Sequence, residues 1–312
     1  MKAIILNKPG GVENFVYSEI DQPQIQHDEV LVQVKAISIN PVDVKVRAGH
    51  GIYQVLKNEQ PVIPGWDISG IITKAGSATP FKAGDEVFGM VRFPGHGKAY
   101  AEYVAVPAHQ LALKPPVISH EEAAAATLAA LTAYQALVIH ATVKEKQRLL
   151  IHAAAGGVGH FAVQMAKRLG AHVTGTSSVN NKPFVMSLGA DEHIDYHHYD
   201  WNNNPEQFDF VLDTVGDENI EKSLKVVKAG GTVISIPSRL SEQVSEQAKA
   251  KNVNALFFLV ASNGGHTKVI ADWLQQGFVK PYISAKFSFD EMGKAHEQVE
   301  SGRTVGKVVV LV

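Results

Sequence analysis

The chain has 312 residues, of which 45% are hydrophobic and 19% charged, and its formal net charge at pH 7 is −2. This length and composition suit two globular domains with sizeable cores, and the near-zero charge gives no electrostatic footprint for nucleic acid or an anionic membrane. Cysteine is absent, which excludes disulfides, thiolate nucleophiles and cysteine-ligated zinc.

The amino-terminal sequence MKAIILNKPGG lacks the long apolar core and the cleavage site of a signal peptide. No apolar run reaches the length of a membrane span. We therefore expect a cytoplasmic protein whose partner is a small-molecule substrate, with no nucleic acid and no membrane partner.

The first hundred or so residues show short runs of β-branched and alternating apolar residues, separated by turn signals such as Pro-Gly and Gly-Asp. This pattern predicts a mainly antiparallel β architecture. The predicted strands cover residues 3–6, 29–37, 68–75, 86–91 and 101–106.

Strands and helices alternate from residue 121 onward, which predicts a parallel sheet with helices on both faces. The predicted helices cover residues 121–138, 160–169, 182–188 and 220–227. The predicted strands cover residues 148–152, 172–176, 208–213, 232–236 and 256–260. The polar segment 239–251 is expected to be a mobile surface stretch.

The last part of the chain is predicted to contain helices at 266–276 and 290–300 and strands at 283–289 and 307–312. Because the termini of one domain often lie close together, we assign this part to the first domain. The predicted division is therefore 1–122 and 261–312 for one domain, with 123–260 inserted as the other.

Residues 149–177 have the order of a βαβ dinucleotide-binding unit: an apolar strand, a small-residue turn, a helix and a second strand. The turn reads Ala154-x-Gly156-x-x-Gly159, with Gly157 and Val158 between the glycines. Small residues let the chain fold sharply and let backbone N–H groups approach a pyrophosphate at the helix N-terminus. The alternative is an ordinary tight turn of another α/β protein.

The end of the second strand favours NADP(H) over NAD(H). An NAD site usually places a carboxylate here, whereas residues 176–182 read TSSVNNK. The hydroxyls of Ser177 and Ser178 and the ammonium of Lys182 would complement a 2′-phosphate dianion. The alternative is a polar loop with a solvated lysine.

Several segments together resemble the medium-chain dehydrogenase/reductase superfamily, and within it the zinc-free quinone oxidoreductase (zeta-crystallin-like) branch. The resemblance covers nearly the whole chain in the expected order. The segments are INPVD at 39–43, PGWDISG at 64–70, FKAGDEV at 81–87, AAAA at 123–126, LTAY at 131–134, AAAGGVG at 153–159, DTVG at 213–216 and GKVV at 306–309.

This resemblance implies an α/β fold with a GroES-like, mainly-β catalytic domain and a doubly wound Rossmann domain that binds NADP(H). It also implies a homodimer, with the strand at 256–260 as the expected interface. Zinc-dependent members place cysteine, histidine and cysteine around a catalytic metal. By alignment, Asn40, Trp66 and Leu128 take those places here, so no zinc site is expected. The 14 histidines show no metal-ligand spacing.

Alcohol oxidation in this fold depends on a Lewis acid, whereas the enolate or hydroquinone anion formed by hydride addition can be stabilised by hydrogen-bond donors. We therefore expect an NADPH-dependent, zinc-independent reductase that transfers hydride to a quinone or an α,β-unsaturated carbonyl compound. The alternatives are a zinc-independent carbonyl or alcohol dehydrogenase, and a non-catalytic protein that binds NADPH or single-stranded nucleic acid.

Asn40 is the first candidate for a substrate-facing donor, because its amide can bond a carbonyl oxygen; the alternative is that Asn40-Pro41 only initiates a turn. The resemblance implies a similar role for Tyr53, which could equally be a packing residue. It also implies that Thr132 presents its hydroxyl to the nicotinamide; the alternative is a helix threonine bonded to its own backbone.

Thr127 lies close to Thr132 in the sequence and is a second candidate for contact with the nicotinamide. Its alternative is a helix threonine bonded to its own backbone. The resemblance further implies that Tyr196 covers the 2′-phosphate together with Lys182, and that Asp67 supports the cleft without acting as an acid.

Overall fold

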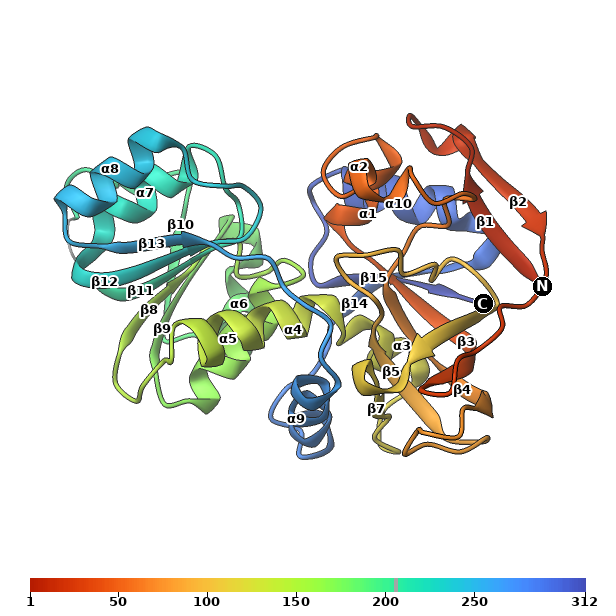
Figure 1. Cartoon of the computed structure of the whole chain (residues 1–312). Helices are drawn as coiled ribbons and strands as arrows, with labels where there is room; N and C mark the ends of the chain where they lie inside the picture. The colour runs from red at the N-terminus through yellow and green to blue at the C-terminus, as the bar shows by residue number, and fades with distance from the viewer. Residues whose placement is uncertain (205–206) are drawn as a thin grey trace. The chain divides into compact units, whose positions relative to one another are not determined.

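The computed structural model describes residues 1–204 and 207–312 and forms two compact units, drawn in Figure 1. Unit 1 comprises Met1–Leu131 and Val260–Val312, and unit 2 comprises Thr132–Leu259. The last part of the chain therefore returns to the first unit. Helix α3 (His120–Ala125) also belongs to unit 1, beyond the predicted boundary at residue 122, because its alanines pack on the sheet of that unit at Ala36 and Val309.

The strands of unit 1 form a two-stranded sheet and a seven-stranded sheet. The small sheet pairs β1 (Lys2–Leu6) with β2 (Phe15–Glu19). The large sheet has the order β14-β15-β3-β4-β5-β7, with β6 also paired to β3. Its strands are β3 (Glu29–Ile39), β4 (Asp67–Ala75), β5 (Glu86–Met90), β6 (Tyr103–Pro107), β7 (Ala112–Leu113), β14 (Ile283–Ser288) and β15 (Lys307–Leu311). All of these pairs are antiparallel except β14 with β15, which confirms the predicted mainly antiparallel architecture.

Unit 1 also carries short helices at the ends of its strands. Besides α3 they are α1 (Pro41–Arg47), α2 (Tyr53–Leu56), α9 (Gly264–Gln275) and α10 (Met292–Glu300). Helix α1 follows β3 directly, because Asn40 is extended and Pro41 occupies the first helical position, where its missing N–H costs nothing.

Unit 2 is a parallel six-stranded sheet of order β10-β9-β8-β11-β12-β13. The strands are β8 (Arg148–Ile151), β9 (His172–Ser177), β10 (Glu192–Asp195), β11 (Phe208–Asp213), β12 (Val227–Ser235) and β13 (Asn254–Phe257). Parallel strands in this doubly wound order confirm the predicted Rossmann-like sheet, whose strand order reverses between β8 and β11.

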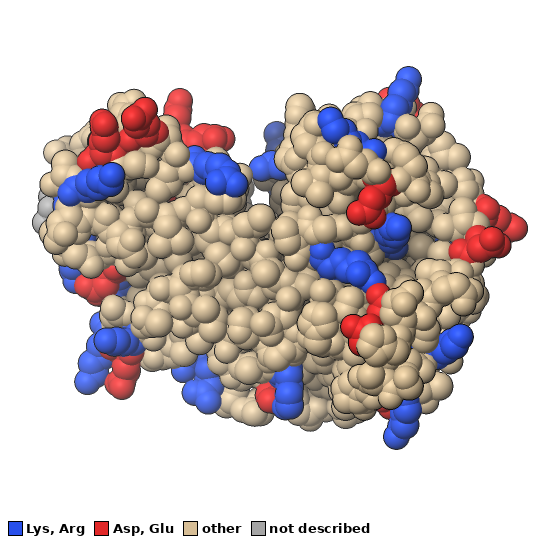
Figure 2. Space-filling model, in the orientation of Figure 1, with Lys and Arg blue, Asp and Glu red and all other residues tan. Residues whose placement is uncertain are grey.

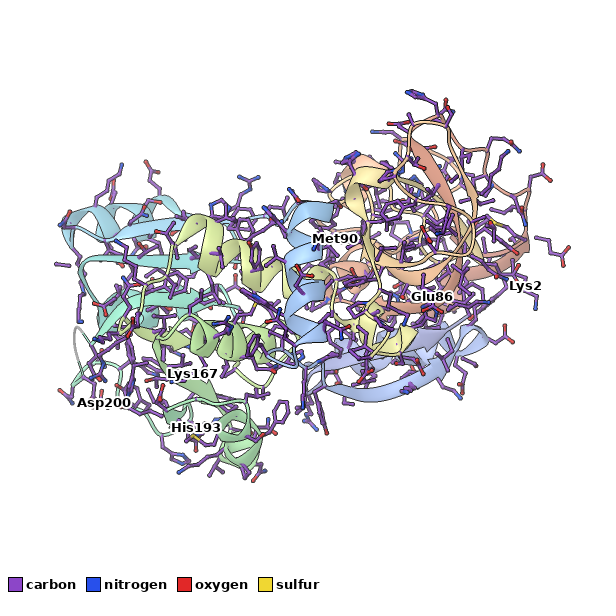
Figure 3. All side chains as sticks on the ribbon, turned by 90° about the horizontal axis from the view of Figure 1, so that it is seen from below. Lys2, Glu86, Met90, Lys167, His193 and Asp200 are labelled. Carbon is purple, nitrogen blue, oxygen red and sulfur yellow. The ribbon has the colours of Figure 1, made fainter. Side chains whose placement is uncertain are left out.

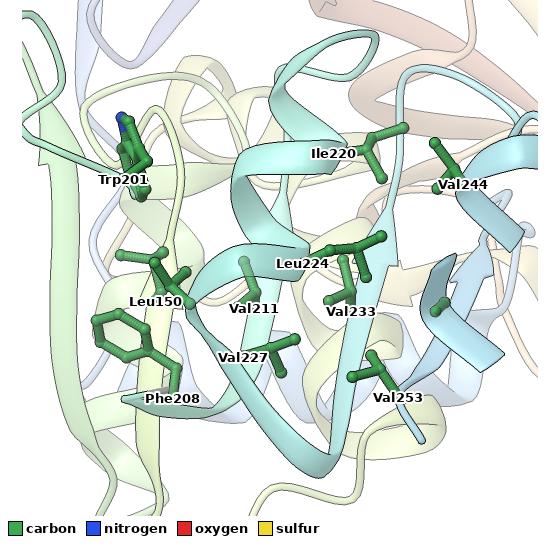
Figure 4. Close-up of a cluster of buried hydrophobic side chains, with 12 residues drawn as sticks. Leu150, Trp201, Phe208, Val211, Ile220, Leu224, Val227, Val233, Val244 and Val253 are labelled. Atoms are coloured by element: carbon green, nitrogen blue, oxygen red, sulfur yellow. The ribbon is translucent and has the colours of Figure 1, made fainter. Parts of the chain in front are cut away.

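Helices cover both faces of this sheet (Figure 1). Helices α5 (Gly159–Arg168) and α6 (Lys182–Ser187) contact β8, β9 and β10, while α7 (Asn219–Val226) and α8 (Glu242–Ala250) contact β11, β12 and β13. Figure 4 shows the core beneath α7 and α8, where Leu224, Val233, Val244 and Val253 are among the buried side chains.

Helix α8 contradicts the expectation that residues 239–251 are a mobile stretch. The Ser241 hydroxyl caps its first turn by accepting the Val244 N–H at 3.2 Å. Val244 and Ala248, one turn apart, are the buried apolar residues of this otherwise polar helix. Two apolar positions among many polar ones gave a helical period too weak to recognise in the sequence.

The predicted helix 121–138 is also interrupted. The structure divides it into α3, α4 (Leu128–Tyr134) and a π-helical segment at Gln135–His140. The break lies at Thr127, because the next N–H, that of Leu128, donates to the Asp67 carboxylate at 2.9 Å. Within the described residues, no helix combines the length and the apolar character needed to cross a bilayer.

Candidate functional site

The turn between β8 and α5 has the close packing that its small residues predict. The Ala154 N–H donates to the Thr176 carbonyl at 2.8 Å and so holds the turn against β9. A Cβ on Gly159 would lie 2.2 Å from the Ala153 carbonyl oxygen, so this position accepts only glycine. On Gly156 the nearest atom to an added Cβ would again be the Ala153 carbonyl oxygen, at 3.2 Å, a tight contact but a much milder one than at Gly159.

The start of α5 is suited to an anion. Val158 occupies the N-cap position and offers no side-chain acceptor to the first turn. The first N–H groups of a helix have no partner within it, and the helix dipole favours negative charge there. Gly156, Gly157 and Gly159 keep Cβ atoms away from this end, so the residues fit a pyrophosphate.

The carboxyl end of β9 carries the predicted phosphate-binding residues. Ser177 is buried, and its Oγ lies 2.9 Å from the Ser178 carbonyl and 2.8 Å from Nε2 of His193 on β10. Lys182 is exposed at the start of α6. Tyr196 is 48% exposed, and its ring lies 4.1 Å from that of His197.

Sequence reasoning missed His193, which stands against Ser177, and it also missed a buried histidine at the end of β8. His152 Nδ1 lies 3.3 Å from Thr176 Oγ1, and Nε2 lies 3.2 Å from Ser223 Oγ. Burial lowers the pKa of His152 to about 4, so its imidazole is neutral at physiological pH. The ring therefore orders the turn through hydrogen bonds and not through charge.

Asp213 ends the neighbouring strand β11 and was quoted only as part of the DTVG segment. Its Oδ1 accepts the N–H groups of Val215 and Gly216 and the amide of Asn219, at 2.9 to 3.1 Å. Gly216 has a φ of 82°, which favours glycine. The segment therefore builds a tight turn beside β8, at the strand ends where ligands bind in such sheets.

Unit 1 contains a buried polar group that we call the Asn40 cluster: Asn40, Asp43, Asp67 and Lys307. Asn40 Nδ2 donates to Asp67 Oδ2 at 2.8 Å, and its Oδ1 accepts from Lys307 Nζ. The Asn40 N–H donates to Asp43 Oδ2 at 2.7 Å. None of the four residues is more than 2% exposed. The amide of Asn40 thus joins a buried cation to a buried anion.

Burial dominates the electrostatics of this cluster. It raises the pKa of Asp43 to about 7, and the neighbouring Asp67 carboxylate adds to the increase. Burial also raises the pKa of Asp67 and lowers that of Lys307, while the attraction between the two opposes both changes. Two carboxyl groups share one ammonium, so a proton on Asp43 leaves the cluster without net charge.

The residues at the aligned zinc positions do not fit a zinc ion. Asn40 Oδ1 is already bonded to the Lys307 ammonium, and Leu128 is apolar. The Trp66 indole donates to the Gly95 carbonyl at 2.7 Å and offers no lone pair to a metal. Among residues 1–204 and 207–312, no three His, Cys, Asp or Glu side chains form a group that could hold a metal ion.

The remaining predicted residues differ in accessibility. Tyr53 begins α2 and is partly exposed. Thr132 is 1% exposed within α4. Thr127 is fully buried and its hydroxyl donates to the Ala124 carbonyl at 2.7 Å, which is the back-bonded arrangement named as the alternative for this residue. Asn40 stands at the N-cap of α1, with its amide engaged on both sides, and its role as a substrate-facing donor stays a prediction.

Comparison with known proteins places this geometry in a family. Residues 26–116 match the family model described as alcohol dehydrogenase GroES-like domain, and residues 188–310 match that described as zinc-binding dehydrogenase. The chain is 37% identical over 303 residues to the 2-methylene-furan-3-one reductase of Solanum lycopersicum, covering 94% of this chain and 74% of that protein. The chain belongs to the medium-chain dehydrogenase/reductase superfamily.

Two further relatives place it in the quinone oxidoreductase branch of that superfamily. The NADPH-dependent alkenal/one oxidoreductase, chloroplastic, of Arabidopsis thaliana is 34% identical over 321 residues, covering 99% of this chain and 79% of that protein. The quinone oxidoreductase structure from Coxiella burnetii aligns with a TM-score of 0.94 at 35% identity, covering 100% of this chain and 99% of that one. The predicted family and fold class are confirmed.

Proposed function

We propose that this protein is an NADPH-dependent oxidoreductase that reduces quinones or α,β-unsaturated carbonyl compounds without zinc. The observation that carries the proposal is that the aligned zinc positions hold no ligand set: Asn40 is bonded to Asp67 and Lys307, the Trp66 indole donates to the Gly95 carbonyl, and Leu128 is apolar. The names of the tomato and Arabidopsis relatives support the substrate class, and the name of the latter supports NADPH.

The residues of unit 2 would hold the dinucleotide. The helix start at Gly157, Val158 and Gly159 accommodates the pyrophosphate, with Ala154 and Gly156 keeping the turn small. The Ser178 hydroxyl and the Lys182 ammonium would bind the 2′-phosphate beside Ser177, whose own hydroxyl donates to the Ser178 carbonyl, and the phenol of Tyr196 covers it. NADPH, when bound, supplies two electrons to the substrate carbon.

The residues of unit 1 would prepare the substrate. The Tyr53 phenol is partly exposed, so it donates a hydrogen bond to the carbonyl or quinone oxygen on which negative charge develops. Thr132, the first residue of unit 2, would present its hydroxyl to the nicotinamide from α4. The buried amide of Asn40 acts indirectly: it fixes the end of β3 and the start of α1, from which the chain continues to Tyr53.

Reduction without a metal has a direct test. Steady-state rates are measured with a panel of quinones, enones and alcohols, using NADPH and NADH in parallel, before and after treatment with 1,10-phenanthroline. We expect turnover of quinones or enones with NADPH favoured at least tenfold, and no effect of the chelator. Activity that disappears under chelation and returns with added zinc would refute a metal-free site. Tight NADPH binding without turnover across the panel would support the non-catalytic alternative.

We also propose the predicted homodimer, formed through β13. This strand lies at the edge of the six-stranded sheet, where its second row of backbone groups can pair with another chain. Light scattering after size exclusion tests it, with a mass of twice 33.7 kDa as the expected result. The cytoplasmic location remains a prediction from the sequence.

A further inference from the structure

His193 stands beside the predicted 2′-phosphate residues on the neighbouring strand. In the parallel ladder its Cα pairs with that of Gly175, and Asp195 pairs with Ser177. Gly175 has no side chain, so the His193 ring reaches along the same face to Ser177, with 2.8 Å between Nε2 and Oγ. Figure 3 labels His193 next to helix α6, which carries Lys182.

The hydrogen bonds of Ser177 define which ring nitrogen is free to take up a proton. The hydroxyl has one proton, and it donates this proton to the Ser178 carbonyl at 2.9 Å. Nε2 of His193 therefore carries hydrogen and donates to Ser177 Oγ. A second proton would enter at Nδ1 and turn the ring into an imidazolium without breaking either contact.

The charges facing His193 come from two elements. Burial lowers the pKa of the imidazole below its usual range, Lys182 on α6 lowers it further, and Asp195 on the same strand as His193 opposes both. The Asp195 carboxylate is itself bonded to His198 at 2.9 Å. The free protein therefore holds a neutral His193 at pH 7, next to a lysine that repels an added positive charge.

We propose that His193 is a specificity-determining residue, which becomes an imidazolium when a 2′-phosphate binds beside Ser177 and so makes the preference for NADPH over NADH stronger as the pH falls. This inference rests on the proposed function. A phosphate dianion offsets the repulsion by Lys182 and attracts the ring charge. Binding of NADPH then takes up a proton from solvent, and binding of NADH, which has a 2′-hydroxyl, does not.

Whether protons are taken up or released on binding distinguishes the titration of His193 from the titration of the phosphate. The second pKa of a phosphate monoester is about 6, and a cationic site lowers it, so titration of the phosphate alone would release protons on binding. Uptake of protons between pH 6.5 and 8 can come only from a protein group that becomes more basic. His193 is the titratable imidazole in contact with Ser177.

Calorimetric titration tests the proposal in two buffers with different ionisation enthalpies, with NADPH and NADH as ligands, at several pH values from 6.5 to 8.5. For the wild-type protein we expect proton uptake with NADPH only. We also expect the ratio of the two affinities to rise about tenfold from pH 8.5 to pH 6.5, as linkage to one group near neutrality allows.

The informative variant is His193→Gln, whose amide can still donate to Ser177. The matched control is His172→Gln, at the opposite end of the adjacent strand β9. We expect H193Q to lose both the proton uptake and the pH dependence, and H172Q to retain them. An unchanged pH dependence in H193Q would overturn the inference while leaving the NADPH preference intact. Equal binding of NADPH and NADH at every pH would instead refute the proposed cofactor.

Discussion

The Asn40 amide donates to Asp67 across 2.8 Å in a part of unit 1 that solvent does not reach. On its other side the same amide accepts from Lys307, so one neutral side chain connects two buried charges. Buried ionic groups cost little only while every partner is present. Figure 2 shows the charged side chains of the surface, which form small scattered groups of both signs. These charges are solvated and therefore do not depend on a partner in the same way.

Asn40→Ala should destabilise the protein by about 3 kcal/mol, because it leaves buried polar atoms of Asp67 and Lys307 without a partner. Urea unfolding monitored by tryptophan fluorescence measures the change. Asn180→Ala, at an exposed asparagine, is the control and should change stability by less than about 0.5 kcal/mol. Equal stability of both variants would mean that the cluster contributes nothing.

Asp43→Asn should alter how stability depends on pH. The folded pKa of Asp43 is raised to about 7, so the folded state binds a proton that the unfolded chain releases above about pH 4. This contribution is complete below the unfolded pKa and is lost as pH rises towards 7. D43N should therefore gain stability relative to wild type from pH 5 to pH 7, by about 1 kcal/mol per pH unit. Asp272→Asn, at an exposed aspartate, should show no such gain in urea titrations.

Gly159→Ala and Gly156→Ala should separate folding from cofactor binding. G159A places a Cβ against the Ala153 backbone and should cost about 3 kcal/mol or more in thermal or urea unfolding. G156A brings a Cβ to 3.2 Å from the same Ala153 carbonyl oxygen, a contact that a shift of a few tenths of an ångström relieves, so it should destabilise the protein much less than G159A. Its Cβ stands on the turn that the pyrophosphate would approach, however, so its NADPH affinity should fall at least tenfold in fluorescence titrations. Unchanged NADPH binding by G156A would exclude the turn as the pyrophosphate site.

Lys182→Ala should weaken NADPH binding about tenfold or more and leave NADH binding nearly unchanged, because only NADPH carries the phosphate that the ammonium faces. Dissociation constants for both nucleotides at two salt concentrations measure this. Lys268→Ala, at an exposed lysine of α9 in unit 1, is the control. A parallel loss for both nucleotides would place Lys182 away from the 2′-phosphate.

Tyr53→Phe should lower kcat with quinones or enones about tenfold to a hundredfold, with the dissociation constant of NADPH unchanged. The control is Tyr17→Phe, whose hydroxyl donates to the Asp290 carbonyl in unit 1. Wild-type turnover by Y53F would make Tyr53 a packing residue.

The sequence predicted the dinucleotide turn and most strands because their signals are local. Gly159, for example, stands within one short segment between a strand and a helix. The Asn40 cluster has no local signal. Lys307 lies 267 residues from Asn40, and a lysine in an apolar strand gives no indication of which acceptor it will meet. His193 was missed for the same reason, since its contact with Ser177 depends on the pairing of β10 with β9.

The place of Lys307 on the last strand has a consequence for synthesis on the ribosome. Strand β15 pairs with β3, so the ammonium that neutralises Asp67 is translated long after Asp67 itself. A nascent chain that has already made β3 and β4 must keep this carboxylate hydrated until the final strand emerges from the exit tunnel. Unit 2, whose residues are contiguous, can fold during translation before β15 emerges, while unit 1 is completed only once β15 has joined it.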